Sequence, residues 1–176
     1  MPDVLVVYDS RTGNTQKAAT LVAEGVGQVK GVNCVLKRVD DVSVDDLMQA
    51  DGIIVGSPTY YGSMSGKIKE LLDKSVELHG RLEGKVGAAF TSSGGTASGA
   101  ETTILSILQA LLIHGMIVQG NPQAQHYGLA VVGAPDGKEK DLCKRFGART
   151  ARLVVKTAKS KRVSAIVKHP RGNGRK

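Results

Sequence analysis

Apolar and polar positions along this chain follow two different periods. Short apolar or alternating runs, typical of strands, occur at residues 3–8, 32–39, 52–56, 85–91 and 116–118. Between them, apolar side chains recur every three or four positions, which predicts helices over residues 15–29, 43–48, 66–78, 100–114 and 138–157. Ser43 is the expected N-cap of the second helix. The apolar run 129–132 is either the continuation of the fifth strand or a neighbouring edge strand.

Strands that alternate with helices predict an α/β fold in one domain over residues 1–158. Parallel strands need crossover connections, which the helices supply, so we expect a three-layer sandwich: a five-stranded parallel sheet with helices on both faces. In such sheets a ligand lies beyond the carboxyl ends of the strands, where the strand order reverses. The loops after the first, third and fourth strands are therefore expected to converge, at residues 10–15, 57–63 and 92–99.

The first of these loops has the residues of a phosphate site. A helix N-terminus presents unpaired backbone N–H groups and a partial positive charge to an anion. Gly13 lets the backbone approach an anion closely. Short polar or charged side chains surround this glycine, at Ser10, Arg11, Thr12, Asn14 and Thr15. The loop lacks both the GK[ST] ending of a triphosphate loop and the GxGxxG of a dinucleotide loop, which favours a single terminal phosphate. The alternative is that the Thr and Asn side chains only cap the helix.

The two other loops offer an aromatic and a glycine-rich surface. Two of the four tyrosines follow the third strand and could stack on a planar ring, within the segment Pro58, Thr59, Tyr60, Tyr61 and Gly62. We favour a mixed arrangement, in which one tyrosine packs on the adjacent helix and the other reaches the site. The loop after the fourth strand supplies backbone N–H groups without bulk for the polar edge of a ring, at Ser92, Ser93, Gly94, Gly95, Thr96 and Ser98. A flexible loop of small residues is the alternative. Tyr127 is expected to border the same site from the loop after the fifth strand.

Charge divides the chain into two parts. The formal net charge is +8, yet residues 1–130 contain 10 Lys and Arg against 13 Asp and Glu, whereas residues 131–176 contain 14 against 3. We interpret residues 159–176 as a basic, solvated tail, with a binding arm for acidic partners as the alternative. No segment approaches the about 20 apolar residues of a membrane span, and no signal-peptide pattern opens the chain, which indicates a cytoplasmic protein.

Nothing in the sequence predicts a metal site or covalent catalysis. Cys34 and Cys143 have no CxxC spacing and no histidine at ligand distance, so both are expected to be structural thiols. No Ser, His and Asp pattern suggests an activated nucleophile. A bound cofactor, rather than a side chain, is therefore expected to carry the chemistry.

The loops resemble those of the flavodoxin-like superfamily. Its [ST]xTGxT pattern is matched at Ser10, Thr12, Gly13 and Thr15. The stretches GSPTYYGSMSGKIKELLD (56–73) and GKVGAAFTSSGGTASGAETTILSILQALLIHGM (84–116) are similar to those of the type IV NAD(P)H:quinone oxidoreductases, also called tryptophan-repressor-binding-protein-like flavoproteins. The resemblance implies the strand order 2-1-3-4-5, FMN as the cofactor of the residues named above, and a homo-oligomer, either a dimer or a tetramer.

Two functions follow from this resemblance. In the first, the protein is an enzyme: NAD(P)H reduces the flavin, which then reduces a quinone or a similar acceptor. In the second, it is an electron carrier that docks to redox partner proteins. Carriers of this family tend to be acidic, and the basic end of the chain fits that role less well. Nucleic acid is the least favoured partner, because the basic segment lacks interleaved aromatic residues.

Overall fold

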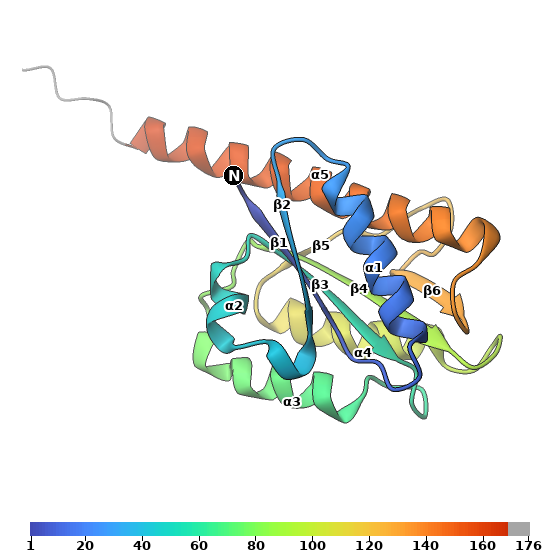
Figure 1. Ribbon diagram of the computed structural model, residues 1–176. Coiled ribbons are helices and arrows are strands. Elements are labelled where there is room, and N and C mark those ends of the chain that lie inside the picture. The colour runs from blue at the N-terminus through green and yellow to red at the C-terminus, as the bar shows by residue number, and fades with distance from the viewer. Residues whose placement is uncertain (169–176) are drawn as a thin grey trace, which may run out of the picture.

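A parallel sheet with helices on both faces forms the structure (Figure 1). It is a computed structural model that describes the backbone of residues 1–168 and the side chains of residues 1–160. The strands are β1 (Asp3–Tyr8), β2 (Asn33–Arg38), β3 (Gly52–Pro58), β4 (Val86–Ser93), β5 (Ile117–Val118) and β6 (Leu129–Val132). The helices are α1 (Asn14–Gly27), α2 (Val44–Gln49), α3 (Gly66–Lys74), α4 (Ala100–Ile113) and α5 (Gly137–Lys168), with 3₁₀ turns η1 (Val39–Asp41) and η2 (Ser75–Leu78).

The strand order is β2-β1-β3-β4-β5, which confirms the predicted order 2-1-3-4-5. β6 also pairs with β4: β5 lies beside Val86 and Gly87, and β6 lies beside residues 90–93. The two short strands therefore follow one another along the same edge of β4, so β6 continues the fifth strand after an excursion over residues 119–128. The strand order reverses between β1 and β3, and the ligand crevice of such a sheet lies at the carboxyl ends of these strands.

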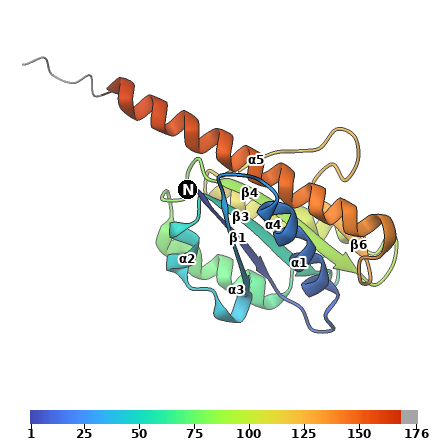
Figure 2. The same cartoon turned by 45° about the horizontal axis from the view of Figure 1, so that its top comes forward.

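Two apolar layers hold the helices against the sheet. Because successive side chains of a strand point to opposite faces, Val4 and Val6 contact one layer, and Leu5 and Val7 contact the other. α1 and α5 cover the first face, and α2, α3 and α4 cover the second, with the sheet between them (Figure 2). Every residue of β3 is buried, as expected for a central strand of a parallel sheet.

The first and last helices touch backbone to backbone. Gly25 of α1 lies against the Lys144 carbonyl and Gly147 of α5 lies against the Val22 carbonyl; a Cβ at either glycine would lie 2.0 Å from that oxygen. A side chain at these positions would hold the helices apart. The two glycines therefore fix α5 beside α1, next to the edge that β6 occupies.

Helix boundaries follow local sequence signals in α2 and α3. Ser43 caps α2 as predicted: its hydroxyl accepts from the Asp46 N–H at 3.2 Å, and the Asp46 carboxylate accepts from the Ser43 N–H at 2.8 Å. The helix expected over residues 66–78 is divided, because α3 ends at Lys74 and the 3₁₀ turn η2 follows it.

α5 is longer than predicted. A helix was expected over residues 138–157 and a tail from residue 159, but α5 continues to Lys168. Figure 1 shows that this last part of α5 extends beyond the sheet. A helix that does not pack on a sheet needs no apolar face, which is why the helical period of apolar residues fades in this part of the sequence. The rest of the expected tail, residues 169–176, lies outside the described residues. None of the described helices is long and apolar enough to cross a membrane.

Candidate functional site

Hydrogen bonds around Ser92 join the loops that follow β1, β3 and β4. The Thr15 hydroxyl lies 2.8 Å from the Ser92 hydroxyl, which connects the start of α1 to the end of β4. The Thr59 N–H donates to the Ser92 carbonyl oxygen at 2.9 Å, which adds the loop after β3. Thr15 and Ser92 are both buried. The structure thus brings together the three loops whose convergence the sheet topology predicts.

The loop before α1 leaves the N-terminus of this helix open. Its N-cap is Gly13, in the left-handed region with φ of 91°, and no side chain of the described residues caps the helix there. The Gly13 N–H donates to the Ser10 hydroxyl at 3.1 Å, which tightens the loop. Apart from residues 12–14 themselves, no heavy atom of the described residues lies within 4 Å of the position that a Cβ of Gly13 would occupy. The first-turn N–H groups of α1 are therefore available to an anion.

The capping alternative does not describe this loop. Asn14 and Thr15 lie inside α1 rather than at its cap, and the Thr15 hydroxyl is engaged with Ser92. Arg11 and Thr12 are exposed at the turn. The loop therefore combines two buried hydroxyls, of Ser10 and Thr15, with one exposed positive charge.

A tight turn after β3 carries the two adjacent tyrosines. Tyr60 and Ser63 exchange two backbone hydrogen bonds of 3.0 Å, and Tyr61 and Gly62 between them have φ angles of 50° and 73°. Positive φ at both central positions is typical of a type I′ turn, and it is uncommon for a tyrosine. The Tyr61 side chain is fully exposed, and that of Tyr60 is 39% exposed. The two tyrosines thus differ in exposure, and the mixed arrangement favoured from the sequence stays a prediction.

Two glycines hold this turn against the start of α4. Gly99 is the N-cap of α4, with φ of 92°, and a Cβ there would lie 2.7 Å from the Gly62 Cα. Only glycine permits so close an approach without displacing one of the loops. Gly99 is not among the residues predicted for the site, although a glycine directly before a helical pattern is a recognisable sequence signal.

Buried hydroxyl groups support the loops from below. The Ser57 hydroxyl donates to the Pro58 carbonyl oxygen and accepts from the Ser65 N–H, both at 2.8 Å. The Thr91 hydroxyl donates to the Ser57 carbonyl oxygen at 2.7 Å and lies 2.9 Å from the Thr59 hydroxyl. Ser57 opens the predicted loop 57–63 but was not named for the site, and Thr91 lies outside the predicted loops; the available signal was a polar residue near the end of each of two buried strands.

The glycine-rich loop after β4 presents open backbone. The hydroxyls of Ser93 and Ser98 both donate to the Gly95 carbonyl oxygen, which shapes the loop from within. A Cβ at Gly94 or at Gly95 would have no neighbour within 4 Å, and Thr96 is exposed. The loop therefore has an internal scaffold and leaves its glycine backbone free to contact a ligand.

Tyr127 is not brought to these loops. It precedes β6, whose first residue, Leu129, pairs with Phe90, whereas the candidate loop begins at the other end of that pairing, after Ser93. The Tyr127 side chain borders a small cavity together with residues 86–88 at the start of β4. A loop that enters a parallel strand lies at its amino end, which is why the expected position of Tyr127 has to be corrected.

The described residues include no group of three or more His, Cys, Asp or Glu that could hold a metal ion. Burial, followed by the nearby Glu139 carboxylate, raises the pKa of the Cys143 thiol to about 11. Burial also raises the pKa of Cys34. Neither thiol is therefore ionised to a useful extent near neutral pH, unlike the thiolate of a reactive cysteine.

Comparison with known proteins identifies the family. A flavodoxin from Aquifex aeolicus is 43% identical over 163 residues, which cover 88% of each chain. The chain belongs to the flavodoxin-like family. An NAD(P)H dehydrogenase (quinone) from Archaeoglobus fulgidus is 36% identical to this flavodoxin-like protein, over 89% of its chain and 99% of the relative. A profile described as NADPH-dependent FMN reductase matches residues 41–126.

A solved structure of a flavodoxin-like protein has the same overall fold. The flavodoxin, WrbA-like protein from Agrobacterium tumefaciens superposes with a TM-score of 0.78 at 25% identity, covering 89% of this chain and 99% of that chain. The flavodoxin-like protein is therefore similar both to a relative named flavodoxin and to one named NAD(P)H dehydrogenase (quinone), over most of the length of each.

FMN is the cofactor that this family implies, and the residues present fit it. The open space at Gly13 and the uncapped first turn of α1 suit its terminal phosphate. The exposed tyrosine turn and the open glycine backbone suit the face and the polar edge of its ring. The predicted loop residues other than Tyr127 thus form one set at the carboxyl ends of β1, β3 and β4.

Proposed function

We propose that this flavodoxin-like protein binds FMN at the three loops and is an NAD(P)H-dependent oxidoreductase that reduces quinones or similar acceptors. Bound FMN would supply the redox chemistry: a hydride from NAD(P)H provides two electrons and one proton, and one further proton from solvent completes the reduction of a quinone to the hydroquinone. The proposal rests on the loop geometry together with the enzyme relatives described above.

The chain's own residues bind and orient the cofactor. The N-terminus of α1 and the hydroxyls of Ser10 and Thr15 bind the phosphate, with Arg11 as an exposed counter-charge. The turn at Tyr61 offers an aromatic surface for the flavin ring. The backbone N–H groups of residues 94–95 stabilise negative charge at the polar edge of a reduced flavin.

The charge of the three loops is the observation that favours an enzyme. Residues 10–15, 57–63 and 92–99 contain no Asp or Glu, and Arg11 is their one charged side chain. A carrier that docks on a basic partner needs an acidic rim around its cofactor, whereas an anionic nicotinamide nucleotide is repelled by such a rim. Loops without carboxylates suit a small anionic donor.

Anaerobic stopped-flow absorbance tests the proposal. The FMN-loaded protein is mixed with NADH or NADPH and then with a quinone, and the flavin band is followed. We expect rapid bleaching by at least one nicotinamide and recovery of the band on adding the quinone. A protein that holds FMN but reacts with neither nicotinamide is not this enzyme.

An electron carrier is the second candidate, and the fully exposed Tyr61 favours it. A strained, exposed aromatic residue beside a cofactor is well placed to contact a partner protein. Rapid reduction by a flavodoxin reductase, without reduction by either nicotinamide alone, would establish this function. Assembly into a homo-oligomer is part of the proposal in both cases, and light scattering coupled to size-exclusion chromatography measures it.

A further inference from the structure

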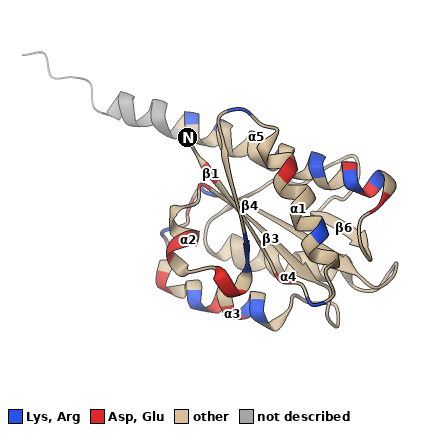
Figure 3. Ribbon diagram, in the orientation of Figure 1, with Lys and Arg blue, Asp and Glu red and all other residues tan. Residues whose placement is uncertain are grey.

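A row of positive charge lies on α5, away from the three loops. Five cations recur at intervals of four and three residues: Arg145, Arg149, Arg152, Lys156 and Lys159. This spacing places them on one face of the helix, and Figure 3 shows the positive residues along α5. Within the described part of the chain none of the five is ion-paired with a carboxylate, whereas the adjacent Lys144 pairs with Glu24 at 2.8 Å. No ion pair with a carboxylate of the described residues therefore offsets the positive charge of this row.

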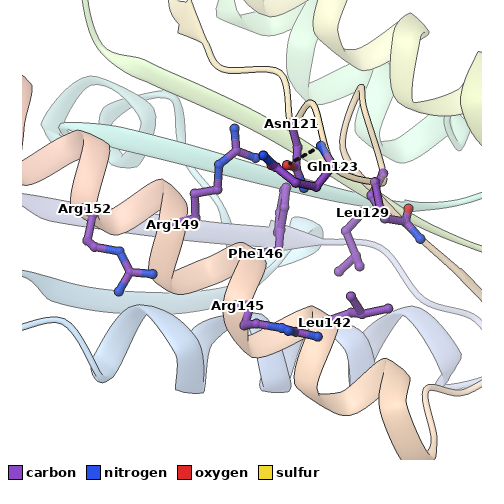
Figure 4. A pocket seen from close by; sticks show the side chains of 10 residues that line it. Asn121, Gln123, Leu129, Leu142, Arg145, Phe146, Arg149 and Arg152 are labelled. Carbon is purple, nitrogen blue, oxygen red and sulfur yellow. Dashed lines mark hydrogen bonds between the residues drawn. The ribbon is translucent and has the colours of Figure 1, made fainter.

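Three arginines of this row line a cavity between α5 and the 119–128 loop (Figure 4). Its volume is about 460 Å³, within the range of about 300–1,000 Å³ that small-molecule sites have. Four side chains make its apolar part: Ala124, Leu129, Leu142 and Phe146. Three amide side chains complete the lining: Asn121, Gln123 and Gln125. No carboxylate lines the cavity, and it shares no residue with the three FMN loops.

The loop wall of this cavity is held in place before any ligand binds. The Gln125 amide accepts from the Ala130 N–H at 2.8 Å and donates to the Ala130 carbonyl oxygen at 3.2 Å. The Asn121 N–H donates to the His126 carbonyl oxygen at 3.0 Å. Arg149 donates to backbone carbonyl oxygens of residues 119 and 120, which ties the loop to α5. A ligand therefore meets a wall that is already ordered, which lowers the entropic cost of binding.

We propose that this cavity is a second ligand site, for a nucleotide that carries at least two phosphate groups. Arg149 is used to hold the loop, so Arg145 and Arg152 remain as guanidinium forks for phosphate oxygens. The Phe146 side chain points from α5 toward the loop (Figure 4) and offers an aromatic surface for a base. The amides of Asn121 and Gln123 can donate to and accept from the edge of that base.

The shape of the site argues for a small ligand rather than a polynucleotide. The apolar surface and the amides belong to the cavity. Among the side chains that the structure describes, the row continues beyond Arg152 as Lys156 and Lys159, outside the cavity lining. Only the end of the row that lines the cavity can enclose a base. A polynucleotide would need stacking surfaces repeated along the helix.

Fluorescence anisotropy of a labelled ADP tests this site. FMN-saturated protein is used, so that the phosphate loop is already filled, and each titration is made at a fixed, stated salt concentration. We expect binding by the wild type and affinity about 10- to 100-fold weaker in Arg145→Gln/Arg152→Gln, because two charge-assisted contacts are lost. Arg145→Lys/Arg152→Lys keeps the charge but loses the planar forks, and its affinity should be intermediate.

Matched controls separate the site from general charge. Lys30→Gln/Arg81→Gln removes two exposed cations elsewhere, and it should bind like the wild type. The FMN content of every variant should be unchanged, because the cavity and the three loops share no residue. Equal loss of affinity in the two double Gln variants would overturn the proposal in favour of non-specific attraction.

Competition identifies the ligand chemistry. ADP should displace the probe more effectively than pyrophosphate does, and adenosine should displace it poorly, since base and phosphates both contribute. If pyrophosphate competes as well as ADP, the cavity is a general anion site and the proposal of a nucleotide ligand is wrong. A single-stranded oligonucleotide that binds much more tightly than ADP, with the same dependence on Arg145 and Arg152, would make the site a polynucleotide surface instead.

Discussion

Three glycines with positive φ, Gly13, Gly62 and Gly99, determine the backbone of the candidate FMN loops. They act in two ways. Gly13 leaves a volume open where a side chain would otherwise stand, whereas Gly62 and Gly99 let two loops approach each other. The loss of function on substitution should therefore have a different cause at each position.

Gly13→Ala should weaken FMN binding by about 10- to 100-fold, because the new methyl group occupies the space proposed for the phosphate. The substitution also strains a backbone with positive φ, at a cost of about 1–3 kcal/mol. Gly31→Ala is the matched control, since Gly31 has φ of 83° and equally open surroundings but lies between α1 and β2. Fluorescence titration with FMN distinguishes them: equal affinity in the two variants would contradict the phosphate assignment.

Tyr61→Leu should lower FMN affinity and shift the reduction potential of the bound flavin, because the leucine keeps bulk but has no aromatic face. The free energy of unfolding of the apoprotein should change little, since the Tyr61 side chain is fully exposed. Tyr127→Leu removes another exposed tyrosine that lies away from the loops, and it should leave the potential unchanged. Redox titration measures both; identical potentials in Tyr61→Leu and the wild type would exclude stacking.

The convergence of the three loops was predictable from the sequence because these loops follow directly from strand ends. Ser10 and Thr15 could be named from the strand-to-helix turn alone. Tyr127 could not be placed, because a loop that interrupts a strand has no period to show at which end of the sheet it lies. Gly99 ends the predicted loop 92–99, but its role was missed because that role depends on contact with Gly62, 37 residues away in the sequence.

Among the elements, the crossing of α1 and α5 depends on two glycines at which a Cβ has no space. From sequence, Gly25 and Gly147 only weaken two helical patterns, since glycine is a poor helix former. The structure shows their role: they let two helices that are far apart in the sequence pack closely. Local periodicity contains no information about such a contact.

Gly147→Ala should destabilise the fold by about 1–3 kcal/mol or more, because the methyl group would lie 2.0 Å from the Val22 carbonyl oxygen and the helices must separate. Gly27→Ala lies in α1 with no neighbour within 4 Å and should stabilise the protein by about 0.5–1 kcal/mol. Urea denaturation of the two variants measures both values. A Gly147→Ala variant as stable as Gly27→Ala would show that the crossing adjusts freely.

The joint between η2 and α4 contains a buried histidine whose proton position follows from its partner. The Ser75 hydroxyl donates to the Leu72 carbonyl oxygen at 2.6 Å, so the His114 Nε2–H must donate to Ser75, at 2.7 Å. Nδ1 of His114 is then unprotonated, and it has no hydrogen-bond partner among the described residues. Burial, and secondarily the charge of His79, lowers the pKa of His114.

The lowered pKa of His114 makes stability depend on pH. The unfolded chain binds a proton at His114 near pH 6.5, whereas the folded protein does so only at lower pH. The free energy of unfolding should therefore fall as the pH decreases through about 6.5 toward the folded pKa. Each unit of pKa difference is worth about 1.4 kcal/mol.

Urea denaturation of His114→Gln and the wild type at pH 7.5 and pH 5.5 measures this contribution. We expect the wild type to lose more stability than His114→Gln over this interval. His126→Gln, which removes an exposed histidine of the 119–128 loop, serves as the control and should follow the wild type. Equal losses in all three proteins would assign the pH dependence to other groups.

The fold of the protein was predictable from the sequence, but the arrangement of its charges was predictable only in part. Strand order, layers and the position of the ligand edge were predictable, because alternating periods leave few parallel topologies open. The division of charge at residue 130 was also evident from sequence. The row of cations on α5 was not evident, because a count of charges in a segment does not show on which face of a helix they lie. Arg145 and Lys159 share a face only because the helix continues through residue 159.

The contact between α1 and α5 has a consequence during synthesis. Residues 14–27 leave the ribosome early, and the apolar surface of Val22 and Val26 must wait for α5, which is translated more than a hundred residues later. Until then the face of the sheet that α5 covers is exposed to other apolar surfaces in the cell. A nascent chain stalled before residue 137 should therefore bind chaperones, and release from them should coincide with the arrival of Gly147 beside Val22.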